Sequence, residues 1–350
     1  MLKQFLQFAA ILLIAILLFA FQNITPGRYS VYEPGNRIEK EWLEKMSVSE
    51  VLIQLGEEKP LHHVATVHED SASMGKQFVY FGKLKSDDKD VPRISKYFVC
   101  TDCHNQVLET DDPSDESPDR VLQYSMENDL PFLPASTFYG MYNMEHWYNG
   151  DYVKKYGDLV KPTRDTLTNA IQLCAIECSQ GRAMKDWEIR CMLHYYKTIE
   201  LKISDLKFSK DELLDLAATV GVNNKKAVKI LKSKYNQIND AHFGTSEIPK
   251  IPDYEPNFEH GKFIYQNGCM YCHTPDKNMT NFKLSMNQLN FEFLARKIDK
   301  YNQYSIPHIV RYGTYAVVGR RQYMPMYTYE NMSEEQLLDL IHFVKTKANE

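Results

Sequence analysis

The sequence predicts a mainly α-helical protein with two small helical domains in tandem, joined by a helical linker that contains prolines. Three observations predict this architecture. A C-x-x-C-H motif occurs twice, at residues 100–104 and 269–273. Apolar residues around both copies recur with the spacing of amphipathic helices. The stretch IPKIPDYEPN, residues 248–257, reads as a proline-stiffened connection. A chain of 350 residues is long enough for two modest domains.

The charge balance argues against one class of partner. The chain carries a net charge of -5, with 25% charged and 43% hydrophobic residues. Nucleic-acid binding needs a surplus of basic residues to neutralise phosphates. We therefore expect no nucleic-acid partner.

Residues 1–22 have the features of an export segment. Lys3 gives a positive start, and the unbroken apolar run FAAILLIAILLFAF follows at residues 8–21. This run has the length of a secretory signal core and is short for a full membrane span. Because no clear cleavage site follows, it fits a signal peptide or an uncleaved N-terminal membrane anchor. In both cases the chain is exported, so we expect a periplasmic protein, secreted or anchored in the inner membrane. Residues 23–69 are uninformative.

The two C-x-x-C-H motifs predict two covalently bound haem c groups. Two thiols about one helical turn apart reach the two vinyl groups of a porphyrin, and the next residue, His104 or His273, supplies the proximal nitrogen to iron. A thioredoxin-like pair needs a βαβ pattern that we do not find, and a zinc site would hold its cysteine pairs closer in sequence. The cofactor-binding cysteines are Cys100, Cys103, Cys269 and Cys272.

Residues 70–204 are expected to form the first haem domain. Apolar spacing predicts helices over 164–179 and 187–199, with Gly181 ending the first. This domain has no Met-Pro step to supply the distal iron ligand. The candidates are Cys174, Cys178, Met141, Met144, His146 and Met184. We expect no disulfide between Cys174 and Cys178, because residues one turn apart on a helix direct their side chains poorly for bridging.

Residues 205–255 are expected to form a helical hairpin and linker. Ser209 and Glu212 form a capping box that opens one helix, and a basic helix follows at residues 225–235. We expect its lysines to be a solvated face; docking of an acidic redox partner is the alternative.

Residues 256–350 are expected to form the second haem domain. A helix over 258–268 leads into the motif, and Ser333 with Gln336 caps the last helix. Its predicted apolar face holds Leu337, Leu338, Ile341 and Val344. Between these helices, Met324 precedes a proline in a loop and offers a thioether as sixth iron ligand, with Met326 as the alternative. This arrangement resembles the distal loop of class I cytochromes c.

The first domain has two further matches to a known pattern. They are the stretch FYG at 138–140 and NAIQLCAIECSQG at 169–181, which follow the first C-x-x-C-H motif. In these stretches the chain resembles the dihaem thiosulfate dehydrogenases and, more loosely, the haem subunit of the Sox sulfur-oxidising complex. The resemblance implies that Cys174, opposite His104, ligates the first iron and is the catalytic residue. A thiolate ligand lowers the potential, so electrons would pass from the first haem to the His/Met haem.

One departure from the family pattern decides which function we expect. Glu177 stands where the family has a basic residue, and a carboxylate near the site would repel a sulfur dianion. We therefore expect an electron carrier whose partner is a redox protein: a cytochrome, an oxidase or a quinol-oxidising complex. The alternative is a thiosulfate dehydrogenase-like oxidoreductase that converts thiosulfate, a small sulfur oxyanion, to tetrathionate at the first haem.

Overall fold

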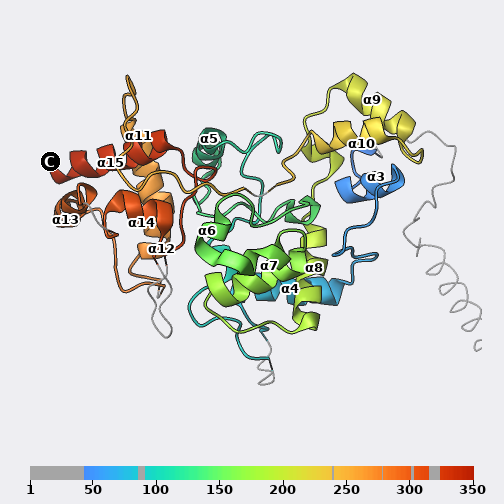
Figure 1. Cartoon of the computed structure of the whole chain (residues 1–350), viewed down its shortest axis with the longest axis horizontal. Helices are drawn as coiled ribbons and strands as arrows, with labels where there is room; N and C mark the ends of the chain where they lie inside the picture. The colour runs from blue at the N-terminus through green and yellow to red at the C-terminus, as the bar shows by residue number, and fades with distance from the viewer. Residues whose placement is uncertain (1–42, 86–90, 239, 278, 301–302, 315–323) are drawn as a thin grey trace, which may run out of the picture. The chain divides into compact units, whose positions relative to one another are not determined.

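Helices dominate the chain, as the sequence predicts (Figure 1). The computed structural model describes residues 43–350 except 86–90, 239, 278, 301–302 and 315–323. In this part of the chain there are two isolated β-bridges and no strand. The predicted export segment lies outside the described residues. Within them, no helix has the length and apolar character needed to cross a membrane.

Two long helices that cross organise the segment around the first C-x-x-C-H motif. Helix α4 (Glu69–Phe81) packs on α8 (Asp186–Thr198), and the backbones meet at Gly75. A Cβ atom at this glycine would lie 2.0 Å from the carbonyl oxygen of Cys191, so only glycine permits this approach. The shorter helices of this segment are α6 (Tyr152–Tyr156) and α7 (Leu167–Leu173).

The C-terminal segment repeats the crossing. Helix α11 (Phe258–Phe263) packs on α15 (Glu334–Ala348), and a Cβ atom at Gly261 would lie 2.0 Å from the carbonyl oxygen of Asp339. The capping box of Ser333 and Gln336 is present as predicted. On α15, Leu340 is buried and the predicted Leu338 is not fully so. The remaining helices here are α12 (Met270–His273), α13 (Gln288–Ile298) and α14 (Ile306–Tyr312).

Helix α5 (Pro118–Asn128) joins the two segments through its core contacts. Leu122 on this helix and Phe132 after it are buried in the same apolar cluster as Ile264 and Phe343 of the C-terminal segment. The chain between the first motif and residue 135 therefore belongs partly to the core around the second motif.

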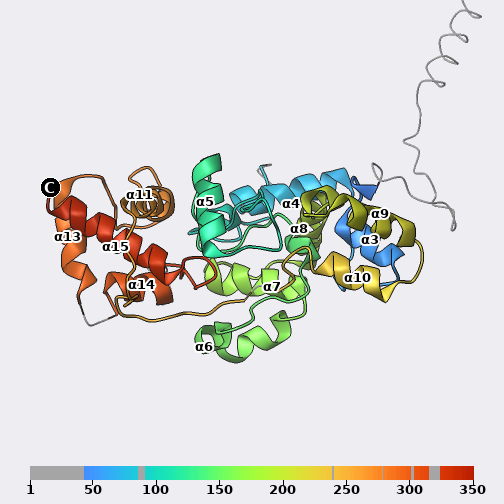
Figure 2. The ribbon, with the colours of Figure 1, turned by 90° about the horizontal axis from the view of Figure 1, so that it is seen from above.

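A third group of helices contains α3 (Val48–Gln54), α9 (Lys210–Thr219) and α10 (Lys225–Lys232), which lie together in both views (Figures 1 and 2). The predicted capping box of Ser209 is present. The ammonium group of Lys232 on α10 lies 2.6 Å from carboxylate oxygens of both Glu57 and Glu145. Lys232 is therefore paired, whereas Lys225, Lys226 and Lys229 of the same helix are exposed, as expected for a solvated basic face.

The helix predicted over residues 164–179 is wrong in extent. Helix α7 begins at Leu167, after an extended residue, and a π-helical turn (Cys174–Cys178) follows it. The amide of Ser179 donates to the carbonyl oxygen of Cys174 at 2.8 Å, five residues back. This wider turn changes how the two cysteines face the site described next.

Candidate haem-binding sites

One cavity gathers the first motif and the predicted distal cysteines. Cys100, Cys103 and His104 line it together with Cys174 and Cys178. Its other walls are mainly apolar and aromatic: Phe78, Phe138, Trp147, Tyr148, Tyr152, Tyr156, Leu167, Met192 and Tyr196. Flat apolar walls with two thiols and an imidazole fit a covalently attached haem.

The proximal histidine of this cavity is oriented by its backbone surroundings. The Nδ1 atom of His104 donates to the carbonyl oxygen of Ser136 at 2.6 Å, and the ring stacks on Phe138 with centroids 4.0 Å apart. Burial lowers the pKa of His104 to about 4, so the imidazole is neutral. With Nδ1 protonated, Nε2 is left with a free lone pair, as an iron ligand requires.

The far side of the cavity offers two sulfur ligands. The interaction between the Cys174 and Cys178 thiols lowers the pKa of Cys178 and raises that of Cys174. The hydroxyl of Tyr156 lies 3.4 Å from the Cys178 sulfur, and that of Tyr148 lies 3.9 Å from it. By these contacts Cys178 is the better stabilised thiolate in the chain without haem, and the family resemblance is what selects Cys174.

The structure separates the other candidates for the distal iron ligand into residues that line the cavity and residues that do not. Met141 and Met184 line the cavity, and the Trp147 indole donates to the Met141 sulfur at 3.0 Å. Met144 lines a neighbouring pocket instead. His146 lies at the surface with 44% of its side chain exposed, 2.6 Å from Asp165. Met144 and His146 are therefore removed from the set.

The charges near the cysteines differ from the sequence-based expectation. Glu177 is not among the side chains that line the cavity. Burial lowers the pKa of Lys155 to about 8, and its charge acts on Cys178. A cation, Lys155, thus acts on the Cys178 sulfur, and any repulsion from Glu177 acts from outside the cavity lining.

The second motif has the same proximal arrangement. Cys269 ends a π-helical turn (Ile264–Cys269) and α12 carries the rest of the motif. The Nδ1 atom of His273 donates to the carbonyl oxygen of Phe282 at 2.8 Å, and burial lowers the pKa of His273. Two thiols and a neutral imidazole with Nδ1 engaged again fit a haem c.

Met324 lies in a loop that is held at its backbone. Its amide donates to the Thr314 hydroxyl at 2.6 Å, and its carbonyl accepts from the Thr314 amide at 3.0 Å. The following stretch is fixed by Arg311 of α14, which is fully buried and donates to the carbonyl oxygens of Met332 at 2.5 Å and Ser333 at 2.9 Å. Sequence reasoning missed this arginine, because nothing local distinguishes a buried guanidinium from a surface one.

The two C-x-x-C-H motifs contact each other. The hydroxyl of Tyr271, inside the second motif, donates to the carbonyl oxygen of Thr101, inside the first, at 3.2 Å. The sulfur of Cys272 lies 3.9 Å from the carbonyl oxygen of Asp102. Pro325 and Met326 of the C-terminal segment also line the first cavity. Met326, the predicted alternative ligand of the second iron, therefore lines the cavity of the first motif.

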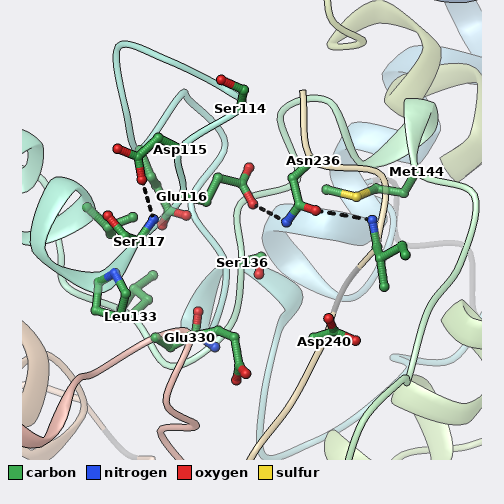
Figure 3. Close-up of a pocket in the computed structure, with 15 residues that line it drawn as sticks. Ser114, Asp115, Glu116, Ser117, Leu133, Ser136, Met144, Asn236, Asp240 and Glu330 are labelled. Atoms are coloured by element: carbon green, nitrogen blue, oxygen red, sulfur yellow. Dashed lines mark hydrogen bonds between the residues drawn. The ribbon is translucent and has the colours of Figure 1, made fainter. Parts of the chain in front are cut away.

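A separate acidic pocket lies behind the first motif (Figure 3). Ser136, which accepts from His104, lines both this pocket and the first cavity. The carboxylates that line the acidic pocket are Glu109, Asp115, Glu116, Asp240 and Glu330. Figure 3 shows Glu116 accepting from the side chain of Asn236, at 3.0 Å. Within the described residues, no group of three or more His, Cys, Asp or Glu side chains is arranged to hold a metal ion.

Glu109 in this pocket is bound to the proximal loop. It accepts from the Asn105 side chain at 2.6 Å and from the Thr137 amide at 2.9 Å. Burial raises its pKa to about 7. The buried carboxyl group of Glu109 therefore links the backbone segment that carries His104 to the segment that carries Ser136, the residue whose carbonyl accepts from His104.

The comparisons with known proteins agree with the second site. Residues 258–348 match the family model of cytochrome c. No curated protein is significantly similar to the chain. This match supports a cytochrome c domain in the C-terminal segment, with a covalently bound haem c and a role in electron transfer.

Proposed function

We propose that this protein is a dihaem c-type cytochrome that passes electrons from the first site to the second and on to a respiratory partner outside the cytoplasm. The observation that carries the proposal is the direct contact between the two motifs, where Tyr271 donates to Thr101. Two redox centres attached to touching segments are suited to fast internal electron exchange.

The residues that would hold the two groups follow from the two sites. Cys100 and Cys103 would bind the first haem and His104 would ligate its iron. Cys269, Cys272 and His273 would do the same at the second site, where Met324 would be a further ligand. A bound haem supplies one-electron iron chemistry, and the protein sets the potential through the distal ligand and burial.

The proposed direction of electron flow comes from the distal ligands. Cys174 as a thiolate lowers the potential of the first site, and a methionine thioether raises that of the second. The hydrophobic N-terminus suits export to the periplasm with membrane attachment or cleavage. The acceptor would then be a protein such as a cytochrome, an oxidase or a quinol-oxidising complex.

The test is a haem count followed by a reductive titration of protein matured in a host that attaches haem c. We expect an intact mass equal to the polypeptide plus two haems, and two resolved one-electron steps. A mass with a single haem, or a spectrum without the sharp reduced α-band, would contradict the proposal.

A second candidate function is favoured by the first cavity. Cys174 and Cys178 line it and Lys155 lies near them, while Glu177 does not line it. A thiol-lined site with a nearby cation suits a small sulfur oxyanion such as thiosulfate, which would be oxidised to tetrathionate at the first site. Turnover of thiosulfate with ferricyanide, abolished in Cys174→Ala and kept in Cys191→Ala, would establish this function. Equal background rates in all three proteins would exclude it.

A further inference from the structure

The cysteine pair of the first cavity sits on an unusual turn. In an α-helix, hydrogen bonds reach four residues back, and residues four apart are offset around the axis. Here the amide of Ser179 reaches back five residues to Cys174. The wider π turn brings residues four apart more nearly into line, so the reason for expecting no bridge between Cys174 and Cys178 no longer holds.

The two cysteines face one space. Cys174 and Cys178 line the same cavity, and their side chains interact closely enough to influence each other's ionisation. The hydroxyl groups of Tyr148 and Tyr156, which line the same cavity, lie 3.9 and 3.4 Å from the Cys178 sulfur. Both cysteines are free and partly exposed to the cavity.

We propose that Cys174 and Cys178 are a redox-active pair that closes to an intramolecular disulfide when the protein is fully oxidised. This inference rests on the proposed function for its natural oxidant, because two ferric haem c centres would each accept one electron. In the reaction one S–S bond forms, two S–H bonds break, two protons leave to solvent and two electrons go to the ferric acceptors. Closing the bridge would withdraw both sulfurs from ligation of the first iron.

The experiment compares thiol counts in the haem-loaded protein. One sample is reduced with dithiothreitol, and the other is oxidised with ferricyanide; both are denatured, alkylated and weighed by mass spectrometry. The haem-bound cysteines are thioethers and do not react. Cys191, which is buried on α8, serves as the internal reference thiol.

We expect three alkylated cysteines in the reduced sample and one in the oxidised sample, with the mass of the unalkylated oxidised chain lower by two hydrogens. The change should vanish in Cys174→Ser and in Cys178→Ser and persist in the matched control Cys191→Ser. Three alkylated cysteines after oxidation, or a bridge between two chains on a non-reducing gel, would overturn the inference. The same spectra report the haem number, so a failed dihaem proposal is recognised separately by a mass with fewer than two haems.

Discussion

The two motif regions of this protein are alike on the proximal side and differ on the distal side. In each, a glycine lets two helices cross, and a histidine donates its Nδ1 proton to a backbone carbonyl, Ser136 for His104 and Phe282 for His273. On the distal side, the first region presents a cysteine pair on a π turn, and the second has a methionine loop fixed by Arg311. In the proposed dihaem protein, the proximal side would determine how haem is attached, and the distal side is where potential and reactivity could diverge.

The largest expected effect tests whether both regions hold haem. Replacing Cys100 and Cys103 by alanine removes both thioether bonds at the first site, and the same change at Cys269 and Cys272 does so at the second. We expect each double variant to lose half of the haem, measured as the pyridine haemochrome per polypeptide. If the first double variant kept the full haem content of the unaltered protein, only the second region would hold haem.

The next effect tests what holds the methionine loop. Arg311→Met removes the donor to the buried carbonyl oxygen of Met332 and one of the two donors to that of Ser333, which still accepts from the Leu337 amide. The lost hydrogen bonds have a charged donor and one carbonyl group is left unsatisfied, so we expect the free energy of unfolding to fall by about 3 kcal/mol. Urea denaturation measures it, with exposed Arg296→Met as the matched control. A change no larger than that of the control would mean that the loop is held by other contacts.

The helix crossings at Gly75 and Gly261 allow the same substitution to be tested in both regions. Gly75→Ala and Gly261→Ala each place a methyl group against a backbone carbonyl, at 2.0 Å before any adjustment. Overpacking of this kind should cost about 3 kcal/mol at either crossing. We would measure both by thermal unfolding beside Ser73→Ala, an exposed position on α4. A cost at one crossing alone would show that the two regions are not equivalent in architecture.

Local patterns made much of the second region predictable. The capping box at Ser333 and the motif at residues 269–273 are short-range signals, and both identify elements that the structure contains. The contact of Tyr271 with Thr101 joins residues 170 positions apart, and the place of Met326 in the first cavity likewise depends on tertiary packing. The π turn after α7 was missed because its apolar spacing continues that of the α-helix.

The last predicted effect concerns the buried carboxyl group behind the first proximal histidine. Burial raises the pKa of Glu109 from its ordinary value of 4.5 to about 7, so folding favours its protonated form. The stabilisation is complete below pH 4.5 and is lost as the pH rises to about 7. Its full size is about 3 kcal/mol.

Glu109→Gln should remove this contribution to the pH dependence of the free energy of unfolding in that window, while the exposed Glu127→Gln should leave it unchanged. Denaturant titrations at several pH values measure the slope. An unchanged slope in Glu109→Gln would mean that the carboxyl group titrates normally in the folded protein.

The difference between the distal sides is tested most directly by low-temperature EPR of the fully oxidised protein. While the cysteine pair is held open, as in Cys178→Ser, the account predicts two low-spin ferric signals of equal intensity, one with the narrow g-spread of thiolate ligation and one typical of His/Met ligation. In the unaltered protein, closure of the pair on full oxidation should remove the thiolate signal. A single signal, or two signals of the His/Met type, in the oxidised Cys178→Ser protein would contradict the account.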